Sequence, residues 1–344
     1  MKSIRALLTV VVTLLAVLGC QHKAGVTPKR TAVHLEESSS REAAKQRFRQ
    51  TKYGVFVHFL GGGSNWNATV NAFDVNTFAR QMQQAGAGYV ILTLGQNSGY
   101  YCAPNATYDR FGGFKPGERC SFRDLPLELA RGLNKRNIKL FLYCTARAPQ
   151  NDPQARAGLA EIDDIIKQPA TQEFSRRWWA VLREWSERYG ERVAGWWFDG
   201  AYTTTGWDDL SQPCNWHTWA AAARAGNPAR LLAFNKGTNI ADAFGALTDE
   251  QDYTAGERNG FDVTPREVPG APKLVWHLLA YLGQDWGKTG GPEKGDQEMI
   301  DYVRRVNERG VVTIDVHVEN GHVHEPHLRQ LIAIRQALRG SSGN

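Results

Sequence analysis

The sequence predicts an α/β fold in which eight parallel strands and their helices close into a single-domain (β/α)8 TIM barrel. Three observations lead to this prediction. β-rich runs alternate with amphipathic stretches, which indicates a parallel sheet. Eight such runs are present, and 344 residues are enough for one barrel of roughly 250 residues and a leader. The apolar fraction of 42% supports a large core.

The expected strands are short runs rich in β-branched and aromatic residues. In order, they are Tyr53–Phe59, Tyr89–Leu94, Ile138–Thr145, Val193–Asp199, Leu231–Asn235, Leu247–Tyr253, Lys273–Leu279 and Val311–Val316. Helical periodicity falls between most of them, at about 75–86, 125–136, 172–189, 216–226, 296–308 and 326–338. Residues 240–270 show little helical periodicity, so the unit between the fifth and seventh strands should be irregular.

The clearest helix is the one at 172–189, in which six apolar residues recur at spacings of three and four. They are Phe174, Trp178, Val181, Leu182, Trp185 and Tyr189. Gly190 follows as a stop signal. The stripe predicts that these tryptophans are buried core residues rather than a surface on which a sugar stacks.

The first twenty residues should form a secretory signal rather than part of the fold. Lys2 and Arg5 give a positive start, and residues 6–18 are almost wholly apolar, which is typical of a signal peptide. The stretch Leu-Ala-Val-Leu-Gly before Cys20 resembles a bacterial lipobox. We therefore expect an exported lipoprotein, anchored through Cys20 on the periplasmic or cell-surface side of a membrane. The alternative is an ordinary signal peptide with an incidental cysteine.

The rest of the chain divides into a tether and a barrel. Residues 21–44 are polar and lack an apolar period over most of their length, as in a flexible tether, and residues 45–340 should form the barrel. The net charge of +6 comes from scattered basic residues, which indicates a solvated surface rather than a nucleic-acid partner.

Export would place four cysteines where disulfides persist. They are Cys102, Cys120, Cys144 and Cys214. Three pairings are possible, and spacing does not choose between them. We expect Cys102 to pair with Cys120 because both lie in one long loop.

In such a barrel the active site lies at the carboxyl ends of the strands. Polar residues occur at most of these ends: His58, Gln96–Ser98, Asn235, Lys236, the 252–257 loop, His277, Asp315 and His317. Asp199 stands out because it ends the run Val-Ala-Gly-Trp-Trp-Phe-Asp, which is apolar on both faces. A carboxylate is costly there unless it is used. The alternative is a structural Asp that caps the next turn.

Strand alternation predicts which way Asp199 faces. The odd-numbered residues from Val193 to Asp199, Trp197 among them, share one face and should point into the barrel. The even-numbered residues between them should pack against the helices. Asp199 would then lie in the mouth of the barrel beside Trp197.

The order of motifs along the chain resembles that of the α-L-fucosidases of glycoside hydrolase family 29. Lys-Tyr-Gly-Val-Phe-Val-His at 52–58 is similar to that family's first-strand Lys-Phe-Gly-Ile-Phe-Ile-His. Residues 85–93 resemble its Ala-Gly-Ala-Lys-Tyr-Ala-Val-Leu-Thr, and residues 140–143 its third-strand Gly-Leu-Tyr. Trp-Phe-Asp-Gly at 197–200 matches the motif that carries the family nucleophile. Asp-Tyr-Thr-Ala-Gly-Glu at 252–257 resembles the stretch that carries the acid/base in many members.

This resemblance implies a retaining glycosidase with Asp199 as nucleophile and Glu257 as general acid/base, with Glu250 and Asp252 as rivals for the second role. A retaining enzyme needs two carboxyl groups about 5–5.5 Å apart, and the acid needs a pKa raised by burial or by the neighbouring carboxylate. Expected substrate contacts are His58, Trp66, Gln96, Asn97, Tyr143, Trp197, Asn235, Lys236 and His277. Two have structural alternatives: Trp66 could pack under its loop, and His58 could be a core histidine.

Departures from the family pattern bear on the substrate. Gly-Gln-Asn-Ser-Gly-Tyr at 95–100 stands where the family has Lys-His-His-Asp-Gly-Phe, whose histidines bind fucose hydroxyls. Asn-Lys at 235–236 replaces Asn-x-Arg, and Trp-His at 276–277 replaces Trp-Glu. The two amides still offer donors and acceptors to a sugar, but we expect weak activity on simple L-fucosides. The C-terminal β-sandwich common in the family is not expected.

The sequence therefore predicts a retaining α-glycosidase related to α-L-fucosidases, with an oligosaccharide or polysaccharide as substrate and no cofactor. The alternatives are a glycosidase for a different sugar, an endo-acting enzyme, or a lipoprotein that binds glycan without hydrolysing it. Four histidines lie in a turn-rich stretch near the end of the chain, without a metalloenzyme pattern, so no metal site is expected. They are His317, His322, His324 and His327.

Overall fold

The computed structural model describes residues 28–161, 165–202 and 206–340. The leader with Cys20 lies outside these residues. By its contacts the chain forms one unit over residues 1–36 and a second over 37–344, and the fold described below is that of the second. No helix in the described ranges is both long and apolar enough to cross a membrane.

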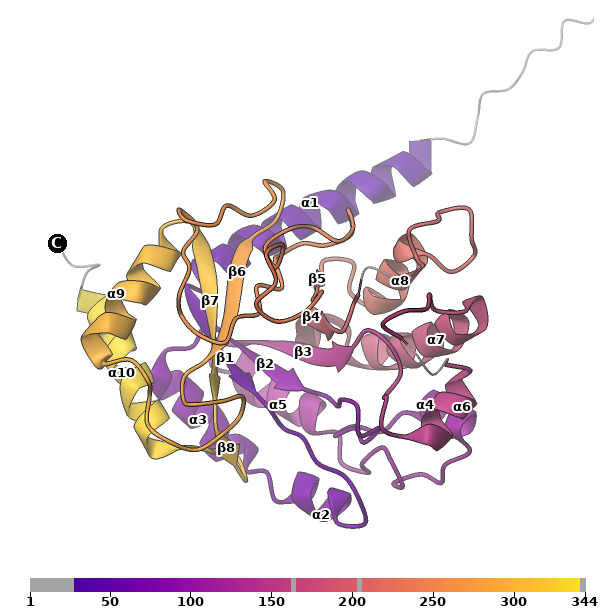
Figure 1. Cartoon of the computed structure of the whole chain (residues 1–344), viewed down its shortest axis with the longest axis horizontal. Helices are drawn as coiled ribbons and strands as arrows, with labels where there is room; N and C mark the ends of the chain where they lie inside the picture. The colour runs from indigo at the N-terminus through magenta and orange to yellow at the C-terminus, as the bar shows by residue number, and fades with distance from the viewer. Residues whose placement is uncertain (1–27, 162–164, 203–205, 341–344) are drawn as a thin grey trace, which may run out of the picture. The chain divides into compact units, whose positions relative to one another are not determined.

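The second unit is built on a curled sheet of parallel strands (Figure 1). The described residues form seven of them, in the order β5-β4-β3-β2-β1-β7-β6. Their bounds are β1 Tyr53–Val57, β2 Tyr89–Thr93, β3 Lys139–Thr145, β4 Val193–Asp199, β5 Leu231–Phe234, β6 Trp276–Tyr281 and β7 Gly310–Val316. Because β1 pairs with both β2 and β7, the last strand returns to the first, as in a TIM-like barrel. A separate antiparallel pair is formed by β8 (Val318–Glu319) and β9 (His322–Val323).

All six expected helices are present, and helices lie along the outside of the sheet (Figure 1). The helices are α1 Pro28–Gln50, α2 Trp66–Asn71, α3 Val75–Ala85, α4 Ala106–Gly112, α5 Leu125–Asn134, α6 Pro153–Leu159, α7 Gln172–Tyr189, α8 Trp216–Ala223, α9 Asp296–Asn307 and α10 Glu325–Gly340. Side-chain caps begin several of them: the Asp74 carboxylate accepts from two backbone N–H groups of α3, and the Thr171 hydroxyl accepts from Phe174 of α7. The apolar stripe of α7 is buried, so the prediction that its tryptophans belong to the core is confirmed.

The strands separate two cores. Inside the curl, aromatic residues from neighbouring strands pack together, among them Phe56, Tyr89, Phe141, Tyr143 and Trp197. The residues that alternate with these pack outward against the helices, as the two-residue period of a strand requires. Side chains at the carboxyl ends of the strands therefore sit on top of a filled interior.

β4 alternates as predicted only beyond a β-bulge. Val193 pairs with Leu140 of β3. Gly195 pairs with the next β3 residue, Phe141, so Ala194 is an extra residue in the ladder. Val193 therefore packs in the outer core and Ala194 against the inner one, which is the reverse of the prediction. From Gly195 onward the odd-numbered residues face inward as expected.

The predicted sixth strand, Leu247–Tyr253, is wrong, because most of these residues form turns. The extended segment is 252–258, and it lies between β5 and β6. The Asp252 N–H donates to the Leu232 carbonyl of β5 at 2.8 Å, while the Asp252 carbonyl accepts from Val275, just before β6, at 3.0 Å. Segment 252–258 thus occupies the position between these two strands without forming a regular ladder.

Gly256 explains why this segment is irregular. Its φ of +59° belongs to the left-handed region, and a Cβ at this position would lie 2.0 Å from the His277 carbonyl oxygen. The backbone turns away there, and pairing with β6 reduces to isolated bridges at Tyr253 and Glu257. A strand pattern that assumes continuous pairing cannot detect such a segment.

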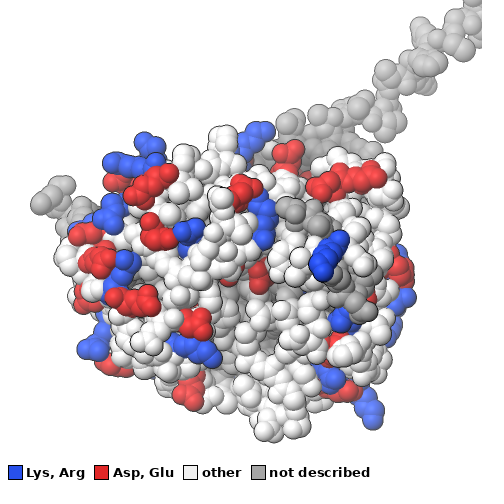
Figure 2. Space-filling model, in the orientation of Figure 1, with Lys and Arg blue, Asp and Glu red and all other residues white. Residues whose placement is uncertain are grey.

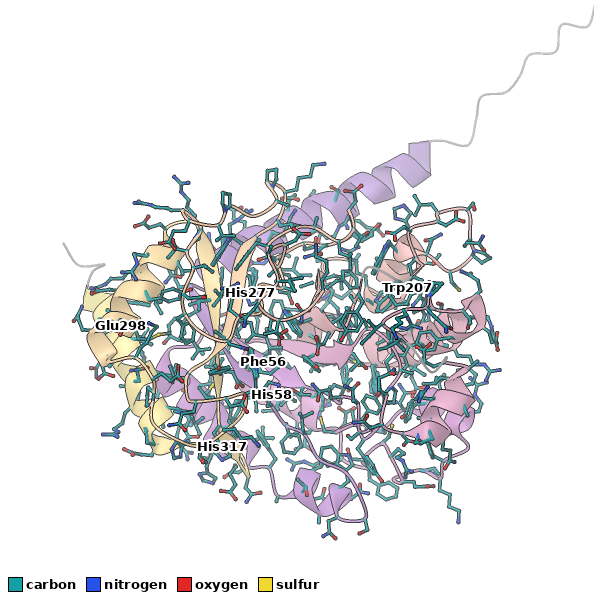
Figure 3. All side chains as sticks on the ribbon, in the orientation of Figure 1. Phe56, His58, Trp207, His277, Glu298 and His317 are labelled. Carbon is teal, nitrogen blue, oxygen red and sulfur yellow. The ribbon has the colours of Figure 1, made fainter. Side chains whose placement is uncertain are left out.

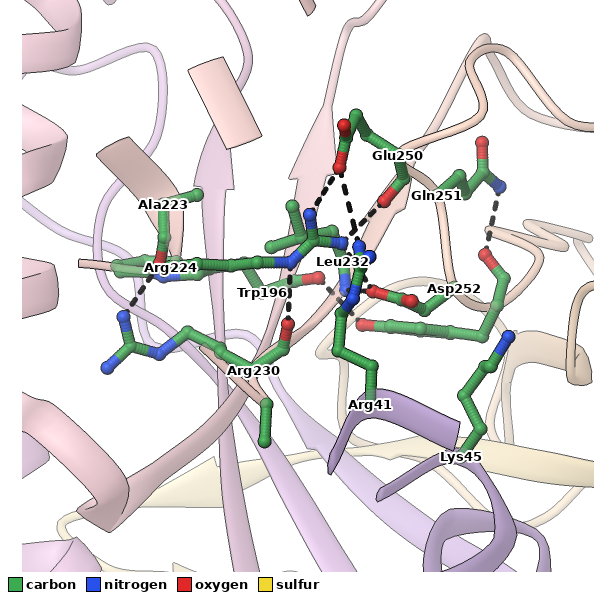
Figure 4. A network of polar contacts seen from close by, with 12 residues as sticks. Arg41, Lys45, Trp196, Ala223, Arg224, Arg230, Leu232, Glu250, Gln251 and Asp252 are labelled. Carbon is green, nitrogen blue, oxygen red and sulfur yellow. Dashed lines mark hydrogen bonds and ion pairs between the residues drawn. The ribbon is translucent and has the colours of Figure 1, made fainter. Parts of the chain in front are cut away.

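A charged network anchors the start of the segment (Figure 4). Arg224, at the end of α8, donates to the carboxylates of Glu250 and Asp252, the latter at 2.9 Å. The Leu232 N–H donates to the same Asp252 oxygen at 2.9 Å. Arg41 of α1 approaches Glu250 at 3.5 Å. The carboxylates of Glu250 and Asp252 therefore hold the start of this segment in place, next to the edge strand β5.

Helix α1, Pro28–Gln50, includes residues 28–44 of the segment expected to be a tether. Phe48, 3% exposed, enters the inner core with its ring centroid 4.9 Å from that of Tyr89 and 5.1 Å from that of Tyr253. The Lys45 ammonium donates to the Lys273 carbonyl at 3.2 Å. The end of α1 thus packs as part of the barrel, at the end of the sheet where β1 begins.

The four cysteines of the described chain are free and buried, so the expected Cys102–Cys120 disulfide is wrong. All four pack in the outer core. The Cys102 thiol donates instead to the Thr93 carbonyl at 3.6 Å.

Candidate active site

Asp199, the last residue of β4, has a carboxylate surrounded by hydrogen-bond donors. The Tyr143 hydroxyl of β3 donates to Oδ2 at 2.6 Å. The Asn235 side-chain amide, directly after β5, donates to Oδ1 at 2.9 Å, and the Gly200 N–H donates to the same oxygen at 2.8 Å. An ionised carboxylate only accepts hydrogen bonds, so this environment matches a negatively charged Asp199.

Glu257, in segment 252–258, has a different environment. The Asn235 amide at 2.7 Å and the Thr238 hydroxyl at 2.6 Å both donate to its Oε2. Burial, followed by the negative charge of Asp199, raises the pKa of Glu257 to about 7, against the opposing effect of these two donors. Since both donors approach Oε2, the proton of the neutral acid is left to Oε1. Near neutral pH, Glu257 can therefore hold a proton and release it.

The same Asn235 nitrogen bridges the two carboxylates. It lies 2.9 Å from Asp199 Oδ1 and 2.7 Å from Glu257 Oε2, so these two oxygens cannot be farther apart than the sum of those distances. Asn235 is held in turn by the backbone, since its N–H donates to the Phe198 carbonyl at 2.8 Å. The pair is therefore close and fixed.

A cleft of about 750 Å³ opens over these carboxylates at the carboxyl ends of the strands. Its lining includes His58, Gln96, Tyr143, Trp197, Asp199, Thr238, Glu257, Trp286 and His317. The face in Figure 2 is hollowed near its centre, and charged residues of both signs are scattered around it. Within the described ranges, no three His, Cys, Asp or Glu side chains are placed to hold a metal ion.

His58 follows β1 and is held on several sides. Its Nδ1 lies 3.2 Å from Asp315 Oδ1, and the ring centroids of Phe56 and Trp286 lie 4.6 and 5.6 Å from that of His58. Asp315 is buried and also accepts from the Gly287 N–H at 2.6 Å. Burial raises the pKa of Asp315, and His58 opposes the rise. The ring of His58 is thus fixed, and Nε2 is the nitrogen that can meet a substrate hydroxyl.

The structure brings five of the nine expected substrate contacts together around the carboxylates. They are His58, Gln96, Tyr143, Trp197 and Asn235. Tyr143 stacks on Trp197 with ring centroids 5.3 Å apart and planes at 19°. The stack forms the floor of the cleft beside Asp199.

Two expected contacts lie outside the cleft. Trp66 is only 2% exposed, and its indole N–H donates to the Tyr101 carbonyl at 2.8 Å, so it packs under its loop and offers no face to a sugar. His277 is fully buried near the start of β6, the end opposite the cleft, and desolvation lowers its pKa to about 4. Figure 3 shows it away from Phe56 and His58, which lie side by side. β6 begins three residues later than predicted, and this shift misplaced His277.

The other two expected contacts lie at the margins. Asn97 lines a smaller hollow of about 230 Å³ that also contains Asp199 and Tyr202. Lys236 pairs with the exposed Asp242. Neither residue lines the larger cleft.

Glu250 and Asp252, the two rivals for the predicted acid role, do not line the cleft. Glu250 and Asp252 both pair with Arg224, at the anchored start of the segment rather than in the cleft. Burial opposes a charged Glu250, but Arg224 and His217 outweigh it and hold its pKa below the usual range. Such a carboxylate is poorly suited to donate a proton near neutral pH.

Sequence reasoning missed Thr238 and Trp286. Thr238 lies in an irregular loop and acquires its role only because that loop folds over Glu257. Trp286 lies in the loop after β6. That strand ends at Tyr281, two residues beyond the predicted end at Leu279. A hydroxyl residue three positions beyond the strand-end Asn235, and an aromatic residue among glycines after a strand, are the signals that could have identified them.

Comparison with known proteins bears on the family and the fold. The sequence pattern of the family described as alpha-L-fucosidase matches residues 61–334. No curated protein sequence matches the chain. Among solved structures, it is similar to the endo-fucoidan hydrolases MfFcnA4 (TM-score 0.62, 16% identity) and MfFcnA9 (TM-score 0.63, 17% identity) of glycoside hydrolase family 107. It is also similar to the alpha-L-fucosidase AlfC from Lactobacillus casei in complex with alpha-L-fucose (TM-score 0.59, 16% identity).

The coverage differs between these structures. The aligned region covers 86%, 87% and 87% of this chain, but 54% of MfFcnA4, 64% of MfFcnA9 and 99% of AlfC. The chain thus spans little more than half the length of MfFcnA4. At these identities the likeness concerns the fold.

Proposed function

Because the chain belongs to the alpha-L-fucosidase family and is a glycoside hydrolase, we propose that it cleaves an α-glycosidic bond with retention of configuration, with Asp199 as nucleophile and Glu257 as general acid and base. The observation that carries this proposal is the single Asn235 nitrogen bound to both carboxylates at 2.9 and 2.7 Å. Retaining glycosidases hold their carboxyl groups about 5–5.5 Å apart, whereas inverting enzymes need about 6.5–9.5 Å to admit a water molecule. The bridged pair fits the first geometry.

In the first step, an Asp199 oxygen attacks the anomeric carbon. Among the described residues, Oδ1 accepts from Asn235 and Gly200, while Oδ2 accepts from Tyr143 alone, so Oδ2 has a lone pair free to form the bond. As the glycosidic bond breaks, its electron pair goes to the leaving oxygen, which takes the proton from Glu257 Oε1.

In the second step, the ionised Glu257 takes a proton from water. The water oxygen attacks the anomeric carbon, the bond to Asp199 breaks, and its electron pair returns to the carboxylate. Thr238 and Asn235 stabilise the ionised form of Glu257 during this step because both donate to it. One residue thus serves as acid and then as base.

We also infer that segment 252–258 takes the place of the eighth strand of the barrel, between β5 and β6. Its hydrogen bonds to Leu232 of β5 and to Leu279 of β6 support this role. Through this segment Glu257 comes close enough to Asp199 for both carboxylates to share the Asn235 amide. The irregularity at Gly256 is therefore part of how the second carboxylate is placed.

The substrate we propose is an α-glycoside related to a fucoside but extended or differently substituted. In the cleft, the Gln96 amide nitrogen is engaged with the Tyr143 hydroxyl at 2.7 Å. A site built to bond particular hydroxyls rejects sugars that leave its polar groups unpaired, by factors that reach ~10⁴. Because the Gln96 nitrogen is already engaged and Asn97 does not line the larger cleft, the site lacks the two hydroxyl contacts that a pair of histidines would supply, so it should favour a sugar with different ring substituents.

A second candidate is endo-action on a fucose-containing polysaccharide. Asp199 lines both the larger cleft and the smaller hollow with Asn97 and Tyr202, so two hollows adjoin the proposed nucleophile. A polymer that continues past the cleaved bond needs such space. Two of the similar structures are endo-fucoidan hydrolases, which makes fucoidan a reasonable polymer to test.

The stereochemistry of the first-formed product tests the proposal. A proton NMR spectrum recorded within minutes of adding enzyme should show the α-anomer before mutarotation. Initial release of the β-anomer would establish inversion and exclude the double displacement. Binding of glycans without any turnover would favour the non-catalytic alternative.

For the location, we propose an exported lipoprotein anchored at Cys20. The support is the apolar stretch at residues 6–18 and the lipobox-like residues before Cys20, all outside the described residues. The membrane would then be a partner through the lipid alone.

A further inference from the structure

Gln96 is linked to Asp199, the proposed nucleophile, through the hydroxyl of Tyr143. The loop after β2 holds it rigidly: the Gly99 N–H donates to the Gln96 carbonyl at 3.1 Å, and a Cβ at Gly95 would lie 2.2 Å from the Tyr101 ring, so only glycine fits there. From this loop the Gln96 Nε2 donates to the Tyr143 hydroxyl at 2.7 Å. The Tyr143 hydroxyl in turn donates to Asp199 Oδ2 at 2.6 Å.

The direction of this chain follows from the number of protons. A tyrosine hydroxyl has one proton to donate, and the ionised Asp199 can only accept. If the Gln96 carbonyl faced Tyr143, two acceptors would compete for that proton and one would be left unpaired. The amide nitrogen must therefore face the hydroxyl, which commits the Tyr143 proton to Asp199.

We propose, on the basis of the function proposed above, that Gln96 is a positioning residue. It keeps the Tyr143 hydroxyl directed so that it donates its hydrogen bond to Oδ2, the attacking oxygen of Asp199. Tyr143 cannot turn away, because it is 2% exposed and stacks on Trp197 at 5.3 Å. Successive hydrogen bonds of this kind polarise one another. Gln96 thus sets the orientation of the attacking carboxylate rather than bonding the sugar through its nitrogen.

Two substitutions separate this role from sugar binding. Gln96→Met removes the donor and adds only a weakly accepting thioether, which competes poorly with a carboxylate, so Tyr143 still donates to Asp199. Gln96→Glu has the same shape as glutamine but offers a carboxylate that competes for the Tyr143 proton. A sugar-binding Gln96 would instead raise KM in both variants.

The experiment measures how fast each enzyme forms a covalent adduct with an activated 2-deoxy-2-fluoro-glycosyl fluoride, followed by the mass of the protein. We expect Gln96→Met to be about 10-fold slower than the parent and Gln96→Glu about 100-fold slower, the latter being typical of a misplaced reacting group. The apparent affinity for the reagent should change less than threefold. Gln284→Glu, on the exposed loop after β6, makes the same chemical change without contacting Tyr143 and should react like the parent.

A double-mutant cycle with Tyr143→Phe completes the test. Once the hydroxyl is removed, Gln96→Glu should add less than threefold to the loss, because groups that act through one another are not additive. Independent, multiplying losses would overturn the inference, as would a Gln96→Glu enzyme that reacts as fast as the parent. If the parent enzyme forms no adduct with the fluoro-glycosyl fluoride of any α-glycoside tested, the proposed function is overturned, and this inference with it.

Discussion

Asp199 and Glu257 share one hydrogen-bond donor, the side-chain amide of Asn235, at 2.9 and 2.7 Å. One carboxylate ends a regular strand and the other lies in a segment with no regular ladder. Their environments nevertheless differ in the way that a retaining mechanism requires. Three donors surround Asp199, whereas burial and the charge of Asp199 keep a proton on Glu257.

Removal of the proposed acid should depend on the leaving group. Glu257→Ala should slow hydrolysis of natural glycosides on the order of 10³-fold, because an alcohol leaves poorly without a proton. Nitrophenyl glycosides, whose leaving group needs little protonation, should be slowed far less. The measurement is kcat/KM for matched substrates with both leaving groups. Equal losses on the two would show that the acid lies elsewhere.

The pH profile should report Glu257 directly. The first step of the proposed reaction needs protonated Glu257, so kcat/KM should fall as pH rises through the Glu257 pKa of about 7. Thr238 donates to the ionised form, so Thr238→Val should raise that pKa and move the alkaline limb upward by about one pH unit, since a hydrogen bond to a charged group contributes about 1.5 kcal/mol.

Thr77→Val, on the outer helix α3, is a matched control and should leave the limb unchanged. A limb that moves downward in Thr238→Val, or one that also moves in the control, would contradict the assignment of the limb to Glu257.

The substrate prediction rests on the loop after β2. With Gln96 and Asn97 in place of two histidines, kcat/KM for nitrophenyl α-L-fucoside should be low beside a panel of other α-glycosides and longer fucose-containing glycans. The panel is measured with one enzyme preparation, so that inactive protein affects all substrates equally. Efficient hydrolysis of the simple fucoside would show that this site binds fucose without the two histidine contacts, and would contradict the prediction.

The lipid anchor is tested on the full-length chain in a bacterial host. The parent should partition with membranes, and its N-terminal peptide should carry a lipid mass on Cys20. Cys20→Ser should yield a soluble or unprocessed protein. A parent protein found free in the medium without lipid would contradict the prediction.

Much of the fold is encoded in local periodicity, and that part could be predicted. The helices and most strands follow from apolar spacing, and Asp199 follows from a buried strand that ends in a carboxylate. Segment 252–258 could not be placed, because its position depends on Arg224 and on hydrogen bonds to β5 and β6 rather than on its own pattern. The bulge at Ala194 could not be predicted for a related reason, because a bulge is defined by how β4 pairs with β3.

The candidate site was predicted where a strand end or a family motif marked it, and missed where contacts between distant residues create it. Asn235 was expected to touch substrate, yet its amide spans both carboxylates. Trp66 was expected either to contact substrate or to pack under its loop, and the choice is decided by packing against Phe59 and by a bond to the Tyr101 carbonyl. Neither fact can be read from neighbouring residues in the sequence.

The most direct measurement is the mass of the enzyme after reaction with an activated 2-deoxy-2-fluoro-glycosyl fluoride of a sugar that it hydrolyses, followed by peptide mapping. One fluoroglycosyl group per chain should be found on Asp199, because fluorine slows the second step and the covalent intermediate accumulates. Asp199→Ala should form no adduct, and azide should restore turnover by attacking from the vacated face. A label on another carboxylate, or no label with a sugar that is turned over, would contradict Asp199 as the nucleophile.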